Sequence, residues 1–261
     1  MKKLGLVLGS SGSRGSSYAG FIKALEENGI KADCVAGSSM GAVVGAAYCM
    51  GMPVDKIERE FGLLNFNHLI DISLTPISNS AILRSRKLEK KLDQYFNGMT
   101  FNDLKIPFCA VAVDLISGNV YDFKGKDSLT LGVTASASIP SVFRPVRKDN
   151  MLLIDGGIKC RMPITQVREM GAEVIVAVDA LGATRVNDKD YNILSVLTRA
   201  IDIMDGELTR HRYQDLKPDL VLEPDLGDMS QYKFKNLDKA IEQGYKLGIE
   251  NIEKIKKLIE C

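Results

Sequence analysis

The chain has 261 residues, of which 45% are hydrophobic and 26% are charged, and its formal net charge is +1. This composition is typical of a soluble globular protein, and the length allows a single α/β domain spanning residues 1–261. The balanced charge provides no broad electrostatic field, which argues against a protein that binds nucleic acid. The five cysteines are widely spaced and include no C-x-x-C pair, so we expect reduced thiols in the cytoplasm and neither a disulfide framework nor a zinc site.

Along the chain, short apolar runs alternate with longer segments of helical periodicity. The first run, Leu4–Leu8, follows a basic N-terminus and superficially resembles a signal peptide, but it is short and Arg14 comes soon after it, so we interpret it as a buried strand. Further strands are predicted at residues 32–36, 107–113, 119–123, 151–154, 173–179 and 220–222, and helices at 18–28, 39–50, 53–64, 83–96, 128–138, 192–212 and 237–259. This alternation predicts a three-layer α/β/α fold with a mostly parallel central sheet.

Residues 52–106, approximately, are predicted to form a mainly helical cover over the site. Their apolar side chains could line a groove for an acyl chain, although ordinary packing is the favoured explanation for any single one of them. The residues concerned are Phe61, Leu63, Leu64, Phe66, Leu69, Ile70, Ile72 and Ile82.

The C-terminal segment is amphipathic, because apolar residues recur there every three or four positions. Its lysines, Lys254, Lys256 and Lys257, could touch a membrane surface. A helix that packs on the core and keeps a cationic end in solvent explains the same pattern, and we favour that interpretation.

The strongest chemical signal is Gly37-Ser38-Ser39-Met40-Gly41, which matches the pattern G-x-S-x-G. It stands directly between a predicted strand and a predicted helix, which is the setting of a nucleophile elbow. The glycines Gly37 and Gly41 allow the backbone to turn sharply at such a site. We therefore predict that Ser39 projects at the carboxyl edge of the sheet as a nucleophile.

A second signal is the loop Gly9-Ser10-Ser11-Gly12-Ser13-Arg14-Gly15, between the first strand and the first helix. Its backbone N–H groups suit an anion, so a phosphate or dinucleotide loop is one interpretation. The loop lacks the lysine of a P-loop and the spacing G-x-G-x-x-G. Because it comes one βαβ unit before an elbow, it is better explained as an oxyanion hole.

A third signal is Asp155-Gly156-Gly157 at the end of a predicted strand, although Asp-Gly alone indicates only a turn. Histidine separates two architectures, since the chain has only His68 and His211. A Ser-His-Asp triad in the α/β-hydrolase order requires a late histidine, which only His211 satisfies. His211 lies in a charged stretch of a long helix, so this triad is a minor alternative, and His68 is better explained as a polar residue of the covering segment.

Together the three motifs resemble the patatin-like phospholipase family, which combines a glycine-rich oxyanion loop, a G-x-S-x-G elbow and an Asp-Gly-Gly or Asp-Gly-Ala strand end. The resemblance covers about residues 4–180. Further similar stretches are Ala24-Leu25-Glu26-Glu27-Asn28-Gly29-Ile30, Ala135-Ser136-Ala137-Ser138-Ile139-Pro140, Phe143-Arg144-Pro145-Val146 and Glu169-Met170-Gly171-Ala172. The resemblance implies a Ser–Asp dyad without histidine, with Ser39 as nucleophile and Asp155 as general base, and no metal or organic cofactor.

The same resemblance assigns roles to the neighbouring residues. Oxyanion donors are expected at Ser11, Gly12 and Met40; Gly9, Ser10, Arg14 and Gly15 are expected to support the loop, and Gly37 and Gly41 to form the elbow.

The chain departs from the family in two places. The family usually has three consecutive glycines where this chain has Ser10, Ser11 and Gly12, and a serine that needed a positive φ would strain the loop. The family also commonly has asparagines where this chain has Lys159-Cys160-Arg161, close to the support of the aspartate.

We therefore expect a serine hydrolase that cleaves lipid acyl esters through an acyl-enzyme, of the phospholipase A, lysophospholipase or esterase type. A patatin-fold binding or regulatory protein, with catalysis weakened by the altered loop, is the alternative. The expected partner is a lipid or other acyl-ester substrate and not nucleic acid. The sequence leaves peripheral membrane contact and the oligomeric state open.

Overall fold

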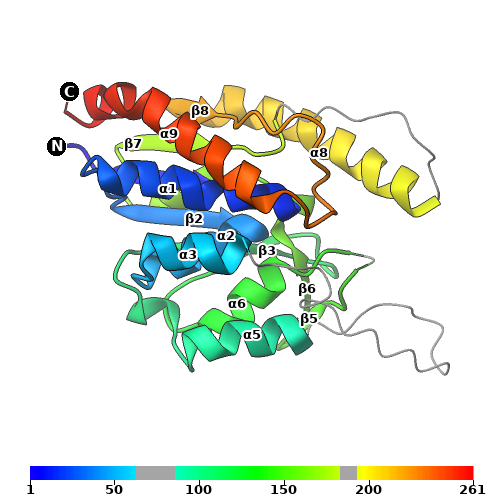
Figure 1. The fold of residues 1–261 in the computed structure, drawn as a ribbon. Coiled ribbons are helices and arrows are strands. Elements are labelled where there is room, and N and C mark those ends of the chain that lie inside the picture. The colour runs from blue at the N-terminus through cyan, green and yellow to red at the C-terminus, as the bar shows by residue number, and fades with distance from the viewer. Residues whose placement is uncertain (63–85, 141, 183–192, 261) are drawn as a thin grey trace.

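The computed structural model of the chain describes residues 1–62, 86–140, 142–182 and 193–260 (Figure 1). The described strands form one sheet, in which the hydrogen-bonded neighbours follow the path β5-β6-β3-β2-β1-β7-β8, and β4 pairs with the other edge of β3. Their bounds are β1 Leu4–Leu8, β2 Cys34–Ser38, β3 Phe108–Asp114, β4 Val120–Phe123, β5 Val146–Lys148, β6 Met151–Asp155, β7 Val174–Val178 and β8 Leu220–Leu222.

Five of these strands run parallel, which confirms the prediction of a mostly parallel central sheet. They are β3, β2, β1, β7 and β8 in their order across the sheet. Strands β4 and β6 are antiparallel to β3, and β5 is antiparallel to β6. All residues of β1, β2, β3 and β7 are buried, as expected for strands that are covered on both faces.

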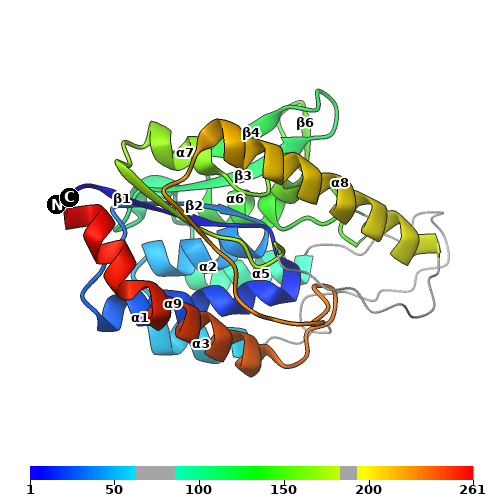
Figure 2. The same ribbon diagram turned by 90° about the horizontal axis from the view of Figure 1, so that it is seen from above.

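Helices cover both faces of the sheet (Figures 1 and 2). Side chains alternate along β1, since Leu4, Leu6 and Leu8 pack toward α1, α2 and α9, whereas Val7 packs toward α7 and α8 on the other face. The helices are α1 Ser17–Glu27, α2 Met40–Cys49, α3 Val54–Gly62, α5 Arg86–Phe96, α6 Leu129–Ser136, α7 Ile164–Glu169, α8 Ile193–Leu216 and α9 Leu237–Glu260, and the short 3₁₀ helices are η1 Gly12–Ser16, η2 Phe101–Asp103 and η3 Gly156–Ile158.

Several of the predicted elements agree only in part with the structure. Strand β2 begins at Cys34 and runs to Ser38, two residues later than expected at each end, and the pattern missed β5 and α7. Helices α3 and α5 fall in the predicted covering segment, but residues 63–85 lie outside the described part of the chain. The hypothesis of an acyl-chain groove rests largely on those residues, and His68 is among them.

The C-terminal helix α9 lies against α1, and its buried residues recur at helical spacing, as the amphipathic pattern indicates. No helix in the described ranges combines the length and the apolar character needed to cross a bilayer. The described cysteines Cys34, Cys49, Cys109 and Cys160 are free thiols.

Two glycines allow α1 and α9 to cross closely. A Cβ atom on Gly20 would fall on the backbone of Ile241, and one on Gly244 would fall on the backbone of Ser17. Backbone atoms in packed helices cannot move aside as a flexible side chain can. A larger residue at either position would therefore push the two helices apart.

We expect Gly244→Ala to lower the free energy of unfolding by about 1–3 kcal/mol, the usual cost of overpacking. Urea titration followed by circular dichroism measures this change. The control is Gly206→Ala in α8, where a new Cβ atom would have nothing nearer than Arg161 Nη1 at 4.0 Å. Replacing a helical glycine by alanine there should stabilise the protein by about 0.5–1 kcal/mol. Equal effects at both positions would disprove the close-crossing explanation.

Candidate active site

Ser39 occupies the turn between β2 and α2, as its motif predicts. Its backbone has φ 54° and ψ −122°, a conformation that costs energy for any residue other than glycine. A Cβ atom on Gly37 would fall on the backbone of Gly41, and one on Gly41 on the backbone of Leu8. The turn is therefore tight on both sides. The Ser39 N–H donates a hydrogen bond of 3.0 Å to Ser136 Oγ, which anchors the strained residue to α6.

Strand β3 brings Ser39 and Asp155 together. Val111 of β3 pairs with Ser38, the last residue of β2, and the next residue, Ala112, pairs with Asp155, the last residue of β6. Both partners lie on the same edge of β3, because β4 occupies the other edge at the same two residues. Strands β2 and β6 run in opposite directions and therefore meet end to end along β3. This register places the residue that follows β2 beside the residue that ends β6.

The side chains of Ser39 and Asp155 are joined by a hydrogen bond in which Ser39 Oγ donates to Asp155 Oδ2 at 2.5 Å. The other carboxylate oxygen, Oδ1, accepts a hydrogen bond of 2.7 Å from the Gly157 N–H. Both side chains are buried, with 3% and 4% of their residues' surface exposed. The second glycine of Asp155-Gly156-Gly157 thus supplies a backbone donor that fixes the carboxylate.

Burial raises the pKa of Asp155 to about 7. The hydrogen bonds from Ser39 and Gly157 favour the ionised form and oppose this rise, whereas the nearby negative charge of Asp205 adds to it. A carboxylate with this pKa is a far better proton acceptor near neutral pH than an exposed aspartate, whose pKa is about 3.9.

His211 does not take part in this arrangement. Its side chain is exposed on α8, and its Nε2 lies 3.4 Å from Glu207 Oε1, one turn away on the same helix. The hydroxyl of Ser39 is already bonded to Asp155. The geometry therefore offers no support for a triad that uses His211.

The glycine-rich loop accommodates its serines without strain. Gly12 has φ 53°, whereas Ser11 has φ −158°, and Ser10 is not among the described residues with positive φ. Among the described residues, the Ser11 N–H makes no hydrogen bond to the backbone of a loop or turn, and Gly12 and Met40 are the first residues of η1 and α2, whose N–H groups have no acceptor within their own helix. Gly12 lines the same pocket as Ser39, and Met40 directly follows Ser39 at the start of α2. These free donors beside a serine hydroxyl are the arrangement expected of an oxyanion hole.

The base of this loop is tied to the sheet. The Gly9 N–H donates to the carbonyl of Val178 at 3.2 Å, and the Ser10 N–H donates to that of Arg161 at 3.0 Å. The fully buried Arg14 donates from Nε to the Ala180 carbonyl at 2.5 Å and from Nη1 to the Met229 carbonyl at 2.9 Å. Arg14 thus holds the loop against the end of β7. Gly15 belongs to the same contact, since a Cβ atom there would collide with Ser11 and Met40.

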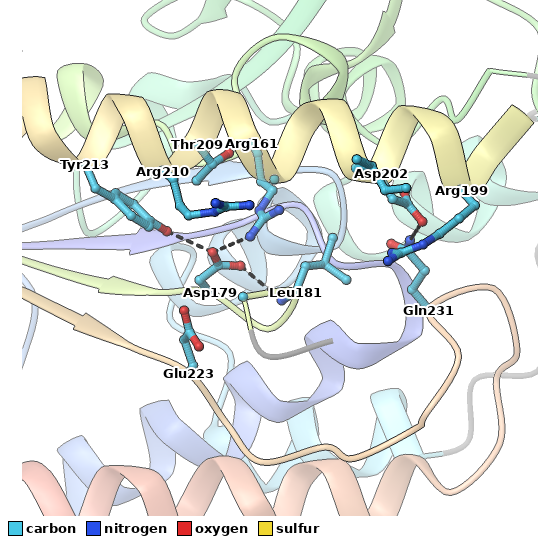
Figure 3. A pocket seen from close by; sticks show the side chains of 13 residues that line it. Arg161, Asp179, Leu181, Arg199, Asp202, Thr209, Arg210, Tyr213, Glu223 and Gln231 are labelled. Atoms are coloured by element: carbon cyan, nitrogen blue, oxygen red, sulfur yellow. Dashed lines mark hydrogen bonds and ion pairs between the residues drawn. The ribbon is translucent and has the colours of Figure 1, made fainter. Parts of the chain in front are cut away.

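A second polar cluster beside the dyad was not foreseen from the sequence. Arg161 is buried and pairs with Asp179 at the end of β7 and, at 3.0 Å, with Asp205 of α8. Tyr213 donates to Asp179 at 2.9 Å, and the Leu181 N–H donates to the same carboxylate at 3.0 Å (Figure 3). Burial alone would lower the pKa of Arg161, but the two adjacent carboxylates raise it. The one sequence feature that pointed to this cluster was Lys159-Cys160-Arg161, which stands where the family commonly has asparagines.

Two adjoining pockets open at this edge. The pocket at Ser39 and Asp155 has a volume of about 80 Å³, and its apolar wall includes Ile139, Pro140, Ile158 and Ile201. The second pocket, of about 360 Å³, lies between α8 and the ends of β7 and β8, and is lined mainly by charged and polar side chains, so we call it the polar pocket (Figure 3). The residues common to both are Leu181, Asp202 and Gln231. The pair can receive a molecule with an apolar part and a polar part.

We expect Asp155→Asn to change the pH dependence of stability. Because the pKa of Asp155 is near 7 in the folded protein and about 3.9 in an unfolded chain, the folded protein holds a proton between these values that the unfolded chain releases. The stabilising effect of this proton is complete below about pH 4 and is lost as pH rises through 7. Asparagine does not titrate, so the variant does not lose this stability as pH rises. The free energy of unfolding of Asp155→Asn minus that of wild type should therefore increase by up to about 4 kcal/mol from pH 4 to 8. Urea titrations at several pH values measure it, and a difference independent of pH would contradict the raised pKa.

We expect Arg161→Met to destabilise the protein by about 3–5 kcal/mol, because it leaves the buried carboxylates of Asp179 and Asp205 without their shared cation. The control is Arg168→Met on α7, since the Arg168 side chain makes an exposed hydrogen bond to the Leu216 carbonyl. Its loss should cost less than about 1 kcal/mol. Similar losses in thermal or urea unfolding for the two variants would show that the cluster is not a structural centre.

Comparison with known proteins places this site in a family. Residues 6–168 match patatin-like phospholipase. An NTE family protein of Mycobacterium tuberculosis is 34% identical over 181 residues, which are 69% of this chain and 50% of the relative. Neuropathy target esterase of Drosophila melanogaster is 32% identical over 184 residues, 67% of this chain and 13% of the relative. The chain thus spans about half of the mycobacterial relative and a small part of the insect one.

Solved structures share the fold. VipD from Legionella pneumophila has a TM-score of 0.59 at 14% identity, covering 97% of this chain and 67% of its own. ExoU of the Pseudomonas aeruginosa type III secretion system has a TM-score of 0.51 at 13% identity, covering 100% of this chain and 53% of its own. On the strength of the sequence match, the chain belongs to the patatin-like phospholipase family.

Proposed function

We propose that the chain is a serine hydrolase of lipid acyl esters, with Ser39 as nucleophile and Asp155 as general base. The observation that carries the proposal is the hydrogen bond of 2.5 Å between the two buried side chains. A serine hydroxyl is a weak nucleophile until a neighbouring base removes its proton, and Asp155 is the base within reach. Its pKa of about 7 allows it to be ionised and still to hold the proton it accepts.

In this mechanism Ser39 Oγ attacks the ester carbonyl while its proton passes to Asp155. The carbonyl oxygen becomes negative and is stabilised by the N–H groups of Ser11, Gly12 and Met40, each worth roughly 3–4 kcal/mol in such sites. Asp155 returns the proton to the departing alcohol, which leaves an acyl-enzyme. Asp155 then accepts a proton from water, which attacks the acyl group, and the acid is released as Ser39 regains its hydrogen.

The lipid character of the substrate is supported by the family and by the pocket. The chain belongs to a phospholipase family, and one relative carries the name esterase. The apolar wall of the Ser39 pocket suits the part of an acyl chain nearest the carbonyl, and the adjoining polar pocket suits a head group. As part of the same proposal, residues 1–261 form one domain that works in the cytoplasm, with about residues 52–106 as its cover.

A fluorophosphonate probe tests the nucleophile, because it reacts covalently with activated serines. We expect wild-type protein to be labelled, Ser39→Ala to be unlabelled and Asp155→Asn to react about 10²–10⁴ times more slowly. The labelling rate should rise with pH through about 7, as Asp155 ionises. Intact-protein mass spectrometry follows the adduct.

Two variants serve as matched controls. Ser38→Ala removes a neighbouring buried hydroxyl that has no hydrogen-bond partner within the described residues, so labelling should persist. His211→Ala should also leave labelling intact. If wild-type protein is not labelled, the chain is better explained as a binding or regulatory protein. If His211→Ala abolishes labelling while Asp155→Asn does not, the triad alternative is correct.

A further inference from the structure

Between Val196 and Leu208, helix α8 has its polarity reversed relative to an ordinary surface helix. Its inward face carries Asp202, Asp205 and Thr209, which contact or line the polar pocket. The remaining surface of the helix carries large apolar side chains with roughly half of their surface exposed, one of which, Ile203, also lines the edge of the polar pocket. These are Val196 at 52%, Ile201 at 42%, Ile203 at 57%, Met204 at 65% and Leu208 at 48%. A helix that packs on its own core shows the opposite pattern, so core packing does not explain these residues.

The exposed apolar residues lie in two rows along the helix. Ile201, Met204 and Leu208 form one row at i, i+3, i+7, and Val196 and Ile203 form a second row at i, i+7, about 100° around the helix. Toward the C-terminal end of the helix, the exposed Glu207 and His211 lie between the two rows. We call these five residues the apolar face of α8. At 3.6 residues per turn, Arg199 and Arg210 border the apolar face on the side of the polar pocket, which they also line, and Arg212 borders it on the other side. Over the N-terminal half of the helix the exposed Ala200 joins the two rows, and soluble monomers rarely expose a contiguous apolar surface without a function for it.

The apolar face adjoins the opening of the Ser39 pocket. Ile201 belongs to the face and also lines that pocket, together with Tyr232, which is 39% exposed. The N-terminal part of α8 projects beyond the sheet at the edge where the arrow of β2 points, and Ser39 directly follows β2 (Figures 1 and 2). Whatever covers the apolar face therefore also covers the opening.

We propose that the apolar face of α8 inserts into the surface of a lipid bilayer and sets the opening of the Ser39 pocket against it. This rests on the proposed function in one respect, which is that the substrate is a lipid. A protein chain on the face would obstruct the path to Ser39, whereas a bilayer would supply substrate directly to it. Arg199 and Arg210 favour the same occupant, because they line the polar pocket beside the opening, where guanidinium groups would attract the anionic head group of a lipid. Glu207 is paired with Arg210 at 2.8 Å, so its negative charge offsets the charge of Arg210 and leaves that of Arg199.

The chain contains no tryptophan, which allows a single reporter to be introduced. We expect the fluorescence of Met204→Trp to shift to shorter wavelength when vesicles of mixed zwitterionic and anionic phospholipid are added, because the indole leaves water. The matched control is Ile249→Trp on α9, a similarly exposed apolar position at 44%. Its emission should not change. Both are made in the Ser39→Ala protein, so that hydrolysis cannot alter the vesicles. A shift for the α9 reporter alone, or for neither, would overturn the proposal.

A second measurement uses charge to block insertion. Met204→Glu combined with Leu208→Glu should weaken co-sedimentation with the same vesicles at least about tenfold, whereas Ile249→Glu should not. Hydrolysis of a soluble short-chain ester should stay within about twofold of wild type, because it needs no surface. If light scattering instead shows a dimer that the double variant dissociates, the occupant is a second copy and the proposal is wrong. Vesicle binding does not depend on Ser39, so a failure of the proposed chemistry would be seen separately.

Discussion

The contact between Ser39 and Asp155 depends on one feature of the sheet, which is that two strands of opposite direction end at neighbouring residues of β3. The parallel strand β2 delivers the serine and the antiparallel strand β6 delivers the aspartate. A shift of β6 by one residue along β3 would turn its side chains to the opposite face and remove the carboxylate from the serine. The hydrogen bond of 2.5 Å is therefore a consequence of strand register, and the glycines around it allow the backbone to follow that register.

Burial makes Asp155 a better proton acceptor, and it also lowers the stability of the folded protein. The same desolvation that raises the pKa of Asp155 also acts on Asp205, whose pKa it raises against the opposing charge of Arg161. Arg161 contributes twice, since its guanidinium bridges two carboxylates and its carbonyl accepts the Ser10 N–H of the oxyanion loop. Because buried charges need partners, α8 turns Asp205 inward to Arg161, while its large apolar side chains between Val196 and Leu208 stay exposed.

The sequence predicted the parts of this site that depend on local backbone geometry. The motif around Ser39, the glycine-rich loop and the Asp155 turn each need particular residues within a few positions, so a pattern can reveal them. The reversed direction of β6 was beyond prediction, because an apolar run indicates burial and not orientation. The three-residue strand β5 and the six-residue helix α7 are too short to show periodicity. The cluster of Arg161, Asp179 and Asp205 joins residues 18 and 44 positions apart, a pairing that only the fold determines.

The central claim is that Asp155 shares a hydrogen bond with Ser39 in a buried site and titrates near neutrality. Carbon-13 NMR of aspartate carboxyl groups, followed from pH 4 to 9, tests it most directly. We expect one carboxyl resonance with a midpoint near 7 that is absent from Asp155→Asn and shifts its midpoint in Ser39→Ala. If every resonance that Asp155→Asn removes titrates near 4, the carboxylate is solvated and the proposed general base does not exist in this form.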